Sequence, residues 1–251
     1  MKAIGFITVI ITALLLLQAE KDFPNWGDPE SPASSYRLSQ HYITQTFPET
    51  TVPNMVTAVL ADYRGYDTMF ETVVIFTAGI AIIGILRVFG SSSQQEHKEP
   101  KLTTKKPDII VATTCRLLLP IIQLFALYVV AHGHHSPGGG FQGGVIFGAG
   151  FILLALSRNL QSAQEWVPEN RILNLAGIGI FIYAGFGVVA LLSGGNFLDY
   201  GFLTKLLPGG VEDARSHSML GVEIGVAFTV TAIMFSIYSN LASNGKMKEG
   251  I

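Results

Sequence analysis

The chain has 251 residues, of which 49% are hydrophobic and 14% are charged, and its formal net charge is −2. The charged fraction is low for a soluble domain, and it excludes an ordinary soluble protein of this length. The net charge says nothing about nucleic acid, but no basic patch with interleaved aromatic residues is present, so we expect no nucleic-acid partner. The single cysteine excludes an internal disulfide or a multi-cysteine metal cluster.

Six apolar segments are long and uncharged enough to be interpreted as membrane-spanning helices, because about 20 residues cross the hydrocarbon core. They cover residues 3–18, 69–89, 109–131, 139–156, 173–192 and 219–237. The expected fold class is therefore an all-α integral membrane protein with about six transmembrane helices. The first segment follows Met1-Lys2 and also resembles a signal peptide, but we favour a retained membrane helix.

The region between the first two segments, residues 19–68, is rich in proline, serine and acidic groups, which break long helices. Asp67 lies in a polar and aromatic turn directly before the second segment. Glu71 lies in the first turn of that segment and Arg87 in its last turn, where each charge suits the helix dipole. A role in ion handling is the alternative interpretation for both residues.

Residues 91–108 form a lysine-rich linker that divides the chain into two domains, 1–90 and 109–251. Its lysines mark the cytoplasmic side of the membrane, because short cytoplasmic loops carry an excess of basic residues. With six spans, both termini then lie in the cytoplasm. The turn between the third and fourth segments, residues 132–139, which we call the His-Gly turn, would face outward.

Two further charged residues lie inside apolar segments, away from the first and last turns. Arg116 lies about two turns inside the third segment, where a charge is costly, so it has a partner in protein or water, or it snorkels to the cytoplasmic surface. Glu223 lies between Gly221 and Gly225 in the last segment. A carboxylate in such a helix is a candidate for a proton relay or an ion site, and a structural hydrogen bond is the alternative.

The His-Gly turn and the helix after it carry a glycine pattern typical of close packing. Pro137 fixes φ and lacks a donor, so the preceding helix is expected to end near His135. Consecutive glycines then allow a tight reversal, and glycines spaced by four form a ridge that another helix can approach closely. The predicted structural motif comprises His134, Pro137, Gly138, Gly139, Gly140, Gly143, Gly144 and Gly148.

The sequence lacks the usual signatures of catalytic and metal sites. His132, His134 and His135 have no nearby carboxylate or cysteine, so we expect no metal there. The glycine-rich turn lacks the Lys-Ser/Thr ending of a phosphate-binding loop, and no nucleophile motif of a hydrolase is present. We therefore expect neither an enzyme active site nor a bound cofactor in this chain.

Residues 133–144, Gly-His-His-Ser-Pro-Gly-Gly-Gly-Phe-Gln-Gly-Gly, resemble the signature of the MnhB family, the B-type subunits of the Mrp-type multisubunit Na+/H+ antiporters. Arg116, Pro120, Tyr128 and the run Gly-Val-Glu-Ile-Gly at 221–225 fit that family too, so the resemblance covers roughly residues 108–238. Residues 54–71 are similar to the carboxy-terminal end of the large A-type antiporter subunit. The same element occurs as a small separate protein, the E-type subunit, in related membrane-bound hydrogenases.

The resemblance implies an accessory membrane subunit of a complex that exports Na+ in exchange for H+ across a bacterial or archaeal cell membrane. Its partners would be other antiporter subunits, including large complex I-like pumping subunits, together with the lipid bilayer. The transported Na+ and H+ would be its only ligands. The ion-path candidates are Glu71, Glu223, Arg116 and Asp67.

Two other functions remain open from the sequence. The chain could be a membrane-arm subunit of an ion-translocating hydrogenase or another complex I-related oxidoreductase, because such complexes use the same modules. It could also be a structural scaffold without ion contact.

Overall fold

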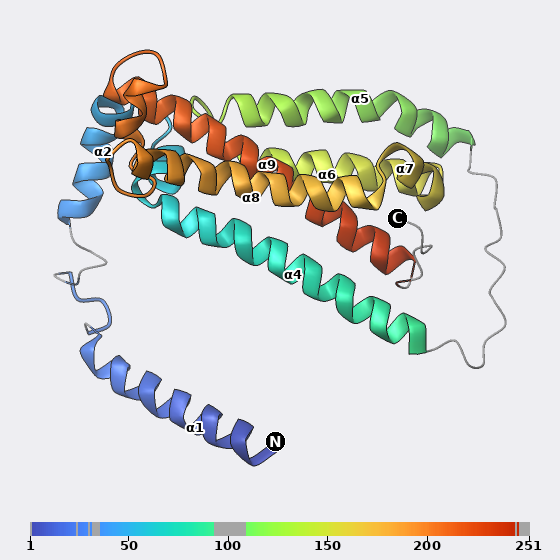
Figure 1. The fold of residues 1–251 in the computed structure, drawn as a ribbon, viewed down its shortest axis with the longest axis horizontal. Coiled ribbons are helices and arrows are strands. Elements are labelled where there is room, and N and C mark those ends of the chain that lie inside the picture. The colour runs from blue at the N-terminus through green and yellow to red at the C-terminus, as the bar shows by residue number, and fades with distance from the viewer. Residues whose placement is uncertain are drawn as a thin grey trace. The chain divides into compact units, whose positions relative to one another are not determined.

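A computed structural model describes residues 2–23, 25–29, 31, 36–92, 109–243 and 245. All regular elements in these residues are helices, which confirms the all-α prediction (Figure 1). In chain order they are α1 (Lys2–Ala19), η1 (Glu20–Asp22), α2 (Tyr36–Thr50), α3 (Met55–Ala58), η3 (Val59–Tyr63, a π-helical turn), α4 (Gly65–Ser92), α5 (Ile109–Ala131), α6 (Gly140–Ser157), α7 (Leu160–Trp166), α8 (Glu169–Leu192), η5 (Tyr200–Lys205) and α9 (Val211–Ala242).

Within the described residues, five helices are long and apolar enough to cross a membrane: α4, α5, α6, α8 and α9. They confirm the last five of the six predicted segments. Helix α1, the first predicted segment, carries a shorter apolar stretch, Val9–Ala19. Its crossing of the membrane, and the cytoplasmic location of both termini that depends on it, stay predictions.

The chain forms two compact units, Met1–Thr44 and Gln45–Ile251, with the boundary inside α2. In the second unit, α4 packs against α8 and α9, although α4 precedes the linker in sequence and the other two helices follow it. Residues 93–108, most of the predicted linker, lie outside the described residues. The division into domains 1–90 and 109–251 stays a prediction.

Helix α9 is the centre of the second unit, where it packs against α4, α6 and α8, while α5 packs mainly against α6. The two ends of this bundle differ in the connections between helices that lie there (Figure 1). The hairpin end holds the His-Gly turn, η5 and the start of α4. The linker end holds the end of α4, the start of α5 and α7.

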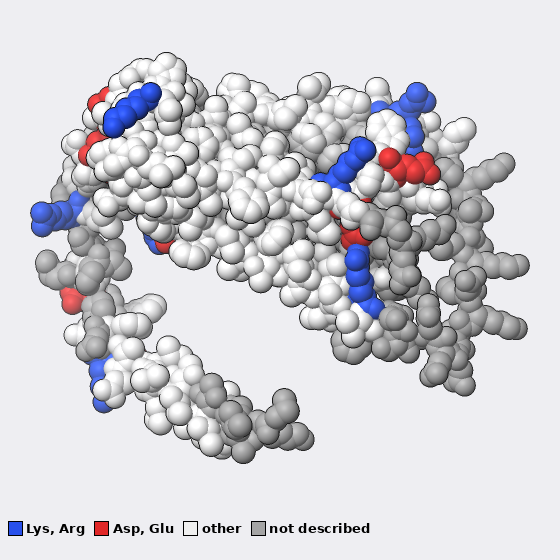
Figure 2. Space-filling view, in the orientation of Figure 1, with Lys and Arg blue, Asp and Glu red and all other residues white. Residues whose placement is uncertain are grey.

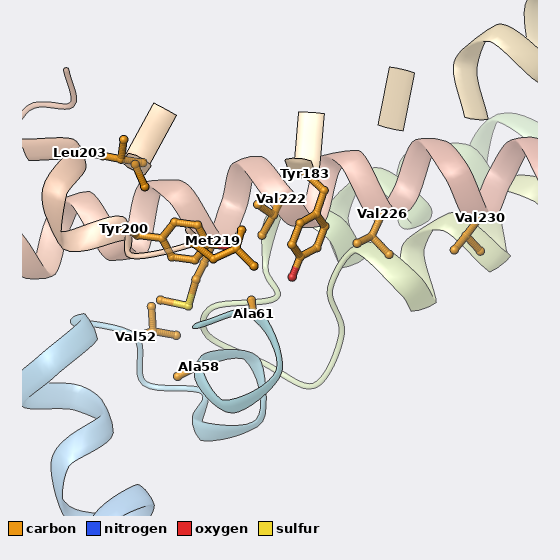
Figure 3. Close-up of a cluster of buried hydrophobic side chains, with 12 residues drawn as sticks. Val52, Ala58, Ala61, Tyr183, Tyr200, Leu203, Met219, Val222, Val226 and Val230 are labelled. Carbon is orange, nitrogen blue, oxygen red and sulfur yellow. The ribbon is translucent and has the colours of Figure 1, made fainter. Parts of the chain in front are cut away.

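The hydrophobic core at the hairpin end joins the segment before α4 to the C-terminal helices. Val52 and Ala61 pack there with Tyr183 of α8 and with Met219 and Val222 of α9 (Figure 3). This shared core fixes residues 52–63 against α8 and α9, and it therefore positions the site described below.

Charged side chains lie at the two ends of the bundle and are absent from its middle on the face that Figure 2 shows. This distribution is expected for a protein that spans a bilayer, because a charge in the hydrocarbon region is costly.

Helix α9 begins eight residues before the predicted start at residue 219. The Asp213 carboxylate accepts a hydrogen bond from the backbone N–H of Gly210 at 3.1 Å, and Glu212 also lies in the first turn. Acidic residues at these positions stabilise a helix start through capping and the helix dipole. The polar residues before 219 therefore form the first turns of α9.

Candidate functional site

A cavity of about 250 Å³ lies between residues 56–72 and the C-terminal helices, near the hairpin end. Glu71 of α4 and Glu223 of α9, which are far apart in sequence, both line it. The other polar side chains in its wall are Thr57, Thr68, Thr72, Gln142 and Tyr183. The structure thus brings two of the four ion-path candidates to one cavity, whose wall is otherwise mostly apolar.

Glu223 lies on α9 in the wall of this cavity, and only 8% of its surface is exposed to solvent. Its Oε2 atom has no hydrogen-bond partner in the part of the chain that the structure describes. A Cβ at Gly133 would lie 2.9 Å from Oε2, and one at Gly139 would lie 2.5 Å from Oε1. The glycines of the turn therefore let its backbone lie directly against the carboxylate.

The His-Gly turn makes the tight reversal that its glycines predict. Helix α5 ends at Ala131, four residues earlier than the predicted end near His135. Gly139 has a φ of 124°, which favours glycine, and its N–H donates to the carbonyl oxygen of Val129 at 3.2 Å. This bond folds the turn back over the end of α5.

Asn54 ties the His-Gly turn to the segment before α4. Its side-chain Nδ2 donates to the carbonyl oxygen of Gly133 at 2.7 Å and to that of Ser136 at 2.9 Å. Its backbone N–H donates to the carbonyl oxygen of His134 at 3.0 Å. The Thr57 hydroxyl also donates to the Gly133 carbonyl at 2.7 Å. Sequence reasoning did not find this clamp, since an asparagine before a short helix indicates only a helix cap.

The helix-dipole interpretation of Glu71 and Arg87 is wrong in its geometry. Helix α4 begins at Gly65 and ends at Ser92, so Glu71 lies beyond the first turn, which Asp67 occupies, and no basic residue lies in the last turn. The dipole effect falls off within one turn of a helix end. Glu71 is exposed on this chain's surface while it also lines the cavity.

The other two ion-path candidates lie away from the cavity. Asp67 is exposed and accepts a hydrogen bond from Arg64 Nε at 2.6 Å. Arg116 is exposed on α5 and has no ion-pair partner among the described residues.

His134 is partly buried at the turn, and its Nε2 has no hydrogen-bond partner among the described residues. Burial lowers the pKa of His134, with smaller contributions from His135 and His217, which favours the neutral imidazole. In the described part of the chain, no cluster of three or more His, Cys, Asp or Glu side chains is arranged to hold a metal ion.

The glycine ridge of α6 packs against α9 of the same chain. A Cβ at Gly140 would collide with the carbonyl oxygen of Glu223, and one at Gly144 would lie 2.9 Å from that of Ala227. Gly148 faces Thr231 in the same way. The ridge was expected to need a partner helix, and the structure supplies that helix within the chain.

A second polar group lies at the hairpin end, and sequence reasoning missed it. Arg215 of α9 donates from Nε to Asp62 Oδ2 at 2.6 Å and lies 3.9 Å from Glu49, while the Tyr63 hydroxyl donates to Glu49 at 2.6 Å. Burial raises the pKa of Asp62, an effect that Arg215 opposes, and burial together with Glu49 raises the pKa of Tyr63 to about 12. Only tertiary folding brings these four residues together.

Fold and site together define a class of protein, a multi-pass α-helical membrane protein whose central helix places a buried carboxylate in the wall of a cavity. Residues 110–236 match the family model described as a domain related to the MnhB subunit of Na+/H+ antiporter, and residues 31–101 match the MbhE model, which describes an MBH subunit. The chain belongs to the MnhB-related family. The resemblance noted in the sequence is thereby confirmed.

Relatives of known name cover the C-terminal part of the chain. A protein of Staphylococcus aureus (strain Newman) named as antiporter subunit mnhB2 is 30% identical over 139 residues, which are 55% of this chain and 96% of that protein. The same match recurs in other strains of that species, including JH1.

Two solved structures are similar over nearly the whole chain. A chain of the membrane-bound sulfane sulfur reductase, an archaeal respiratory membrane complex, is 25% identical with a TM-score of 0.61, covering 96% of this chain and 97% of that one. A chain of the Mrp complex from Dietzia sp. DQ12-45-1b is 22% identical with a TM-score of 0.67, covering 100% of this chain and 27% of that one. The second likeness shows a shared fold.

Proposed function

We propose that this chain is an accessory membrane subunit of a multisubunit monovalent cation/proton antiporter of the Mrp type. The complex exports Na+ in exchange for H+, driven by the proton gradient, across a bacterial or archaeal cell membrane. Other antiporter subunits, including large complex I-like pumping subunits, are its partners. Membership of the MnhB-related family and the match to nearly all of an mnhB2 protein support this proposal.

The cavity shared by Glu71 and Glu223 is the observation that carries a direct role in ion passage. Carboxylates inside a membrane protein are costly and mark ion and proton pathways. Glu223 is buried, and its Oε2 is left without a hydrogen bond by the described residues, so it can accept a proton or face a cation. The chain works without a cofactor or an enzymatic activity of its own.

Conservative variants in the intact complex test this role. We expect Glu223→Gln and Glu71→Gln to assemble normally and to lower Na+-dependent proton exchange in inside-out vesicles by about tenfold or more, as the loss of a positioned proton carrier does. Asp67→Asn is the matched control, because Asp67 lies in an exposed ion pair outside the cavity. Exchange at the native rate in both glutamine variants would reduce the role of this chain to that of a structural scaffold.

The membrane arm of a redox complex is the second candidate. It is favoured by the likeness to a chain of the sulfane sulfur reductase complex, which extends over almost the full length of both chains. Purification through a tag on this chain in mild detergent separates the two candidates. Large pumping-type subunits without iron–sulfur proteins indicate the antiporter, whereas co-purifying iron–sulfur proteins indicate the redox arm.

A further inference from the structure

Buried titratable side chains connect the cavity to the Asp62–Arg215 group at the hairpin end. We propose that the hydroxyls of Tyr183 and Tyr200 relay protons between Asp62 and Glu223, so that the cavity exchanges protons with the hairpin side of the membrane. This inference rests on the proposed function of the cavity, and it adds the route by which protons reach it.

Tyr183 is the cavity end of the route. It is fully buried on α8, and it lines the same cavity as Glu223. Its hydroxyl donates to the carbonyl oxygen of Gly65 at 2.8 Å, and Figure 3 shows this hydroxyl pointing toward the segment that carries Ala61. The phenol therefore extends from the cavity to the junction of η3 and α4.

Tyr200 of η5 continues the route away from the cavity. Its residue is 1% exposed, and its hydroxyl has no hydrogen-bond partner among the described residues. The hydroxyls of Tyr183 and Tyr200 converge on Gly65, where each lies 3.7 Å from the position that a Cβ would occupy. Because Gly65 has no side chain, no Cβ projects toward the two hydroxyls.

Asp62 is the outer end of the route, because it lies three residues before Gly65, on which the two hydroxyls converge. Burial, Tyr183 and the nearby charge of Asp62 together raise the pKa of Tyr200 well above its usual value, so the phenol stays protonated. Burial also raises the pKa of Asp62, which favours proton uptake by this carboxylate. Asp62 is bound to Arg215, whose side chain is 20% exposed, so the group reaches the surface of the chain.

A phenol hydroxyl can pass a proton without ionising, because it is both a donor and an acceptor. A proton that leaves the Asp62 carboxylic acid forms a new O–H bond on Tyr200, while the original O–H bond breaks and its proton moves to Tyr183. The same exchange at Tyr183 delivers one proton to the Glu223 carboxylate. Asp62 ends as a carboxylate and Glu223 as a carboxylic acid, so one proton has moved and both tyrosines are restored.

Packing is the competing explanation for two buried tyrosines, and Tyr200 distinguishes it from a relay. Because the Tyr200 hydroxyl makes no hydrogen bond within the described residues, Tyr200→Phe removes no bond that stabilises the fold. Tyr183→Phe removes one bond to Gly65. Tyr238→Phe, at a partly buried tyrosine near the other end of α9, is the matched control.

The test uses the intact complex in inside-out vesicles, in H2O and in D2O. We expect Tyr200→Phe and Tyr183→Phe to assemble normally, to exchange about tenfold more slowly, and to show a larger H2O/D2O rate ratio than the native complex and the Tyr238→Phe control. A packing defect would not change that ratio. Gly65→Ala adds a methyl group at ordinary contact distance from both hydroxyls, and we expect it to slow exchange in the same way.

Native rates and native isotope ratios in the tyrosine and Gly65→Ala variants, with slow exchange in Glu223→Gln, would overturn the relay and leave the proposed function intact. If Glu223→Gln also exchanges at the native rate, the ion-path role of the cavity itself is wrong. The two failures are therefore distinguishable in one set of measurements.

Discussion

At the scale of single residues, Arg87 shows how tertiary contacts override the helix position that the sequence suggests. Its guanidinium pairs with Glu169 of α8, and its Nε donates to Asn240 Oδ1 of α9 at 3.3 Å. Glu169 is 7% exposed, so its carboxylate depends on this partner for compensation of its charge. The three residues join α4, α8 and α9 at the linker end.

This pair predicts a specific stability pattern. Because the Arg87 side chain is 42% exposed and partly solvated, Arg87→Gln should cost about 1–2 kcal/mol, less than the loss of a partner in a fully buried pair. Glu169→Gln should cost a similar amount, and the double variant should cost less than the sum of the two. Thermal unfolding of the purified complex measures all three, and additive costs would show that the two side chains act independently.

At the scale of elements, the contact between α6 and α9 depends on glycine. Gly144 lies where a Cβ would be 2.9 Å from the carbonyl oxygen of Ala227 and 3.0 Å from the Cβ of Val230, and neither backbone can move freely. Thr231 strengthens the contact, since its hydroxyl donates to the Gly144 carbonyl at 3.0 Å. The helices can approach this closely only because the ridge has no side chains.

We therefore expect Gly144→Ala to destabilise the chain by about 1–3 kcal/mol through overpacking. Gly144→Leu should prevent its folding and so its assembly. Gly185→Ala on α8 is the control, because a Cβ there meets nothing within 4 Å and should leave thermal stability unchanged. Equal stability of the two alanine variants in the purified complex would contradict close packing of α6 on α9.

The same elements show how far sequence reasoning reaches. Apolar length predicted α4, α5, α6, α8 and α9 because hydrophobic segments of this size have one stable environment, the membrane. The glycine pattern of α6 predicted a close contact but not that α9 would make it. The shared cavity of Glu71 and Glu223 was not predictable, because it depends on contacts such as that between Asn54 and Gly133, 79 residues apart.

At the scale of the whole molecule, the basic residues at the two ends of the bundle bear on an orientation that is independent of α1. The linker end carries Arg87, Arg158 and Arg171 against two acidic residues, Glu165 and Glu169. The hairpin end carries more acidic than basic residues, with Glu49, Asp62, Asp67, Asp199, Glu212 and Asp213 against Arg64, Lys205 and Arg215. The rule for orientation counts basic residues, and the two ends carry three described basic residues each. The linker sequence adds four lysines to the linker end, Lys98, Lys101, Lys105 and Lys106, and this excess favours a cytoplasmic linker end.

Labelling of single cysteines with a membrane-impermeant maleimide tests this orientation. In a Cys115→Ala background, we expect Lys205→Cys in η5 to react in intact cells, because the hairpin end faces outward and Lys205 is exposed. Gln161→Cys, exposed on α7 at the linker end, should react only after permeabilisation. The opposite pattern would invert the orientation of all five described spans, and the proposed proton route from Asp62 would then open to the cytoplasm.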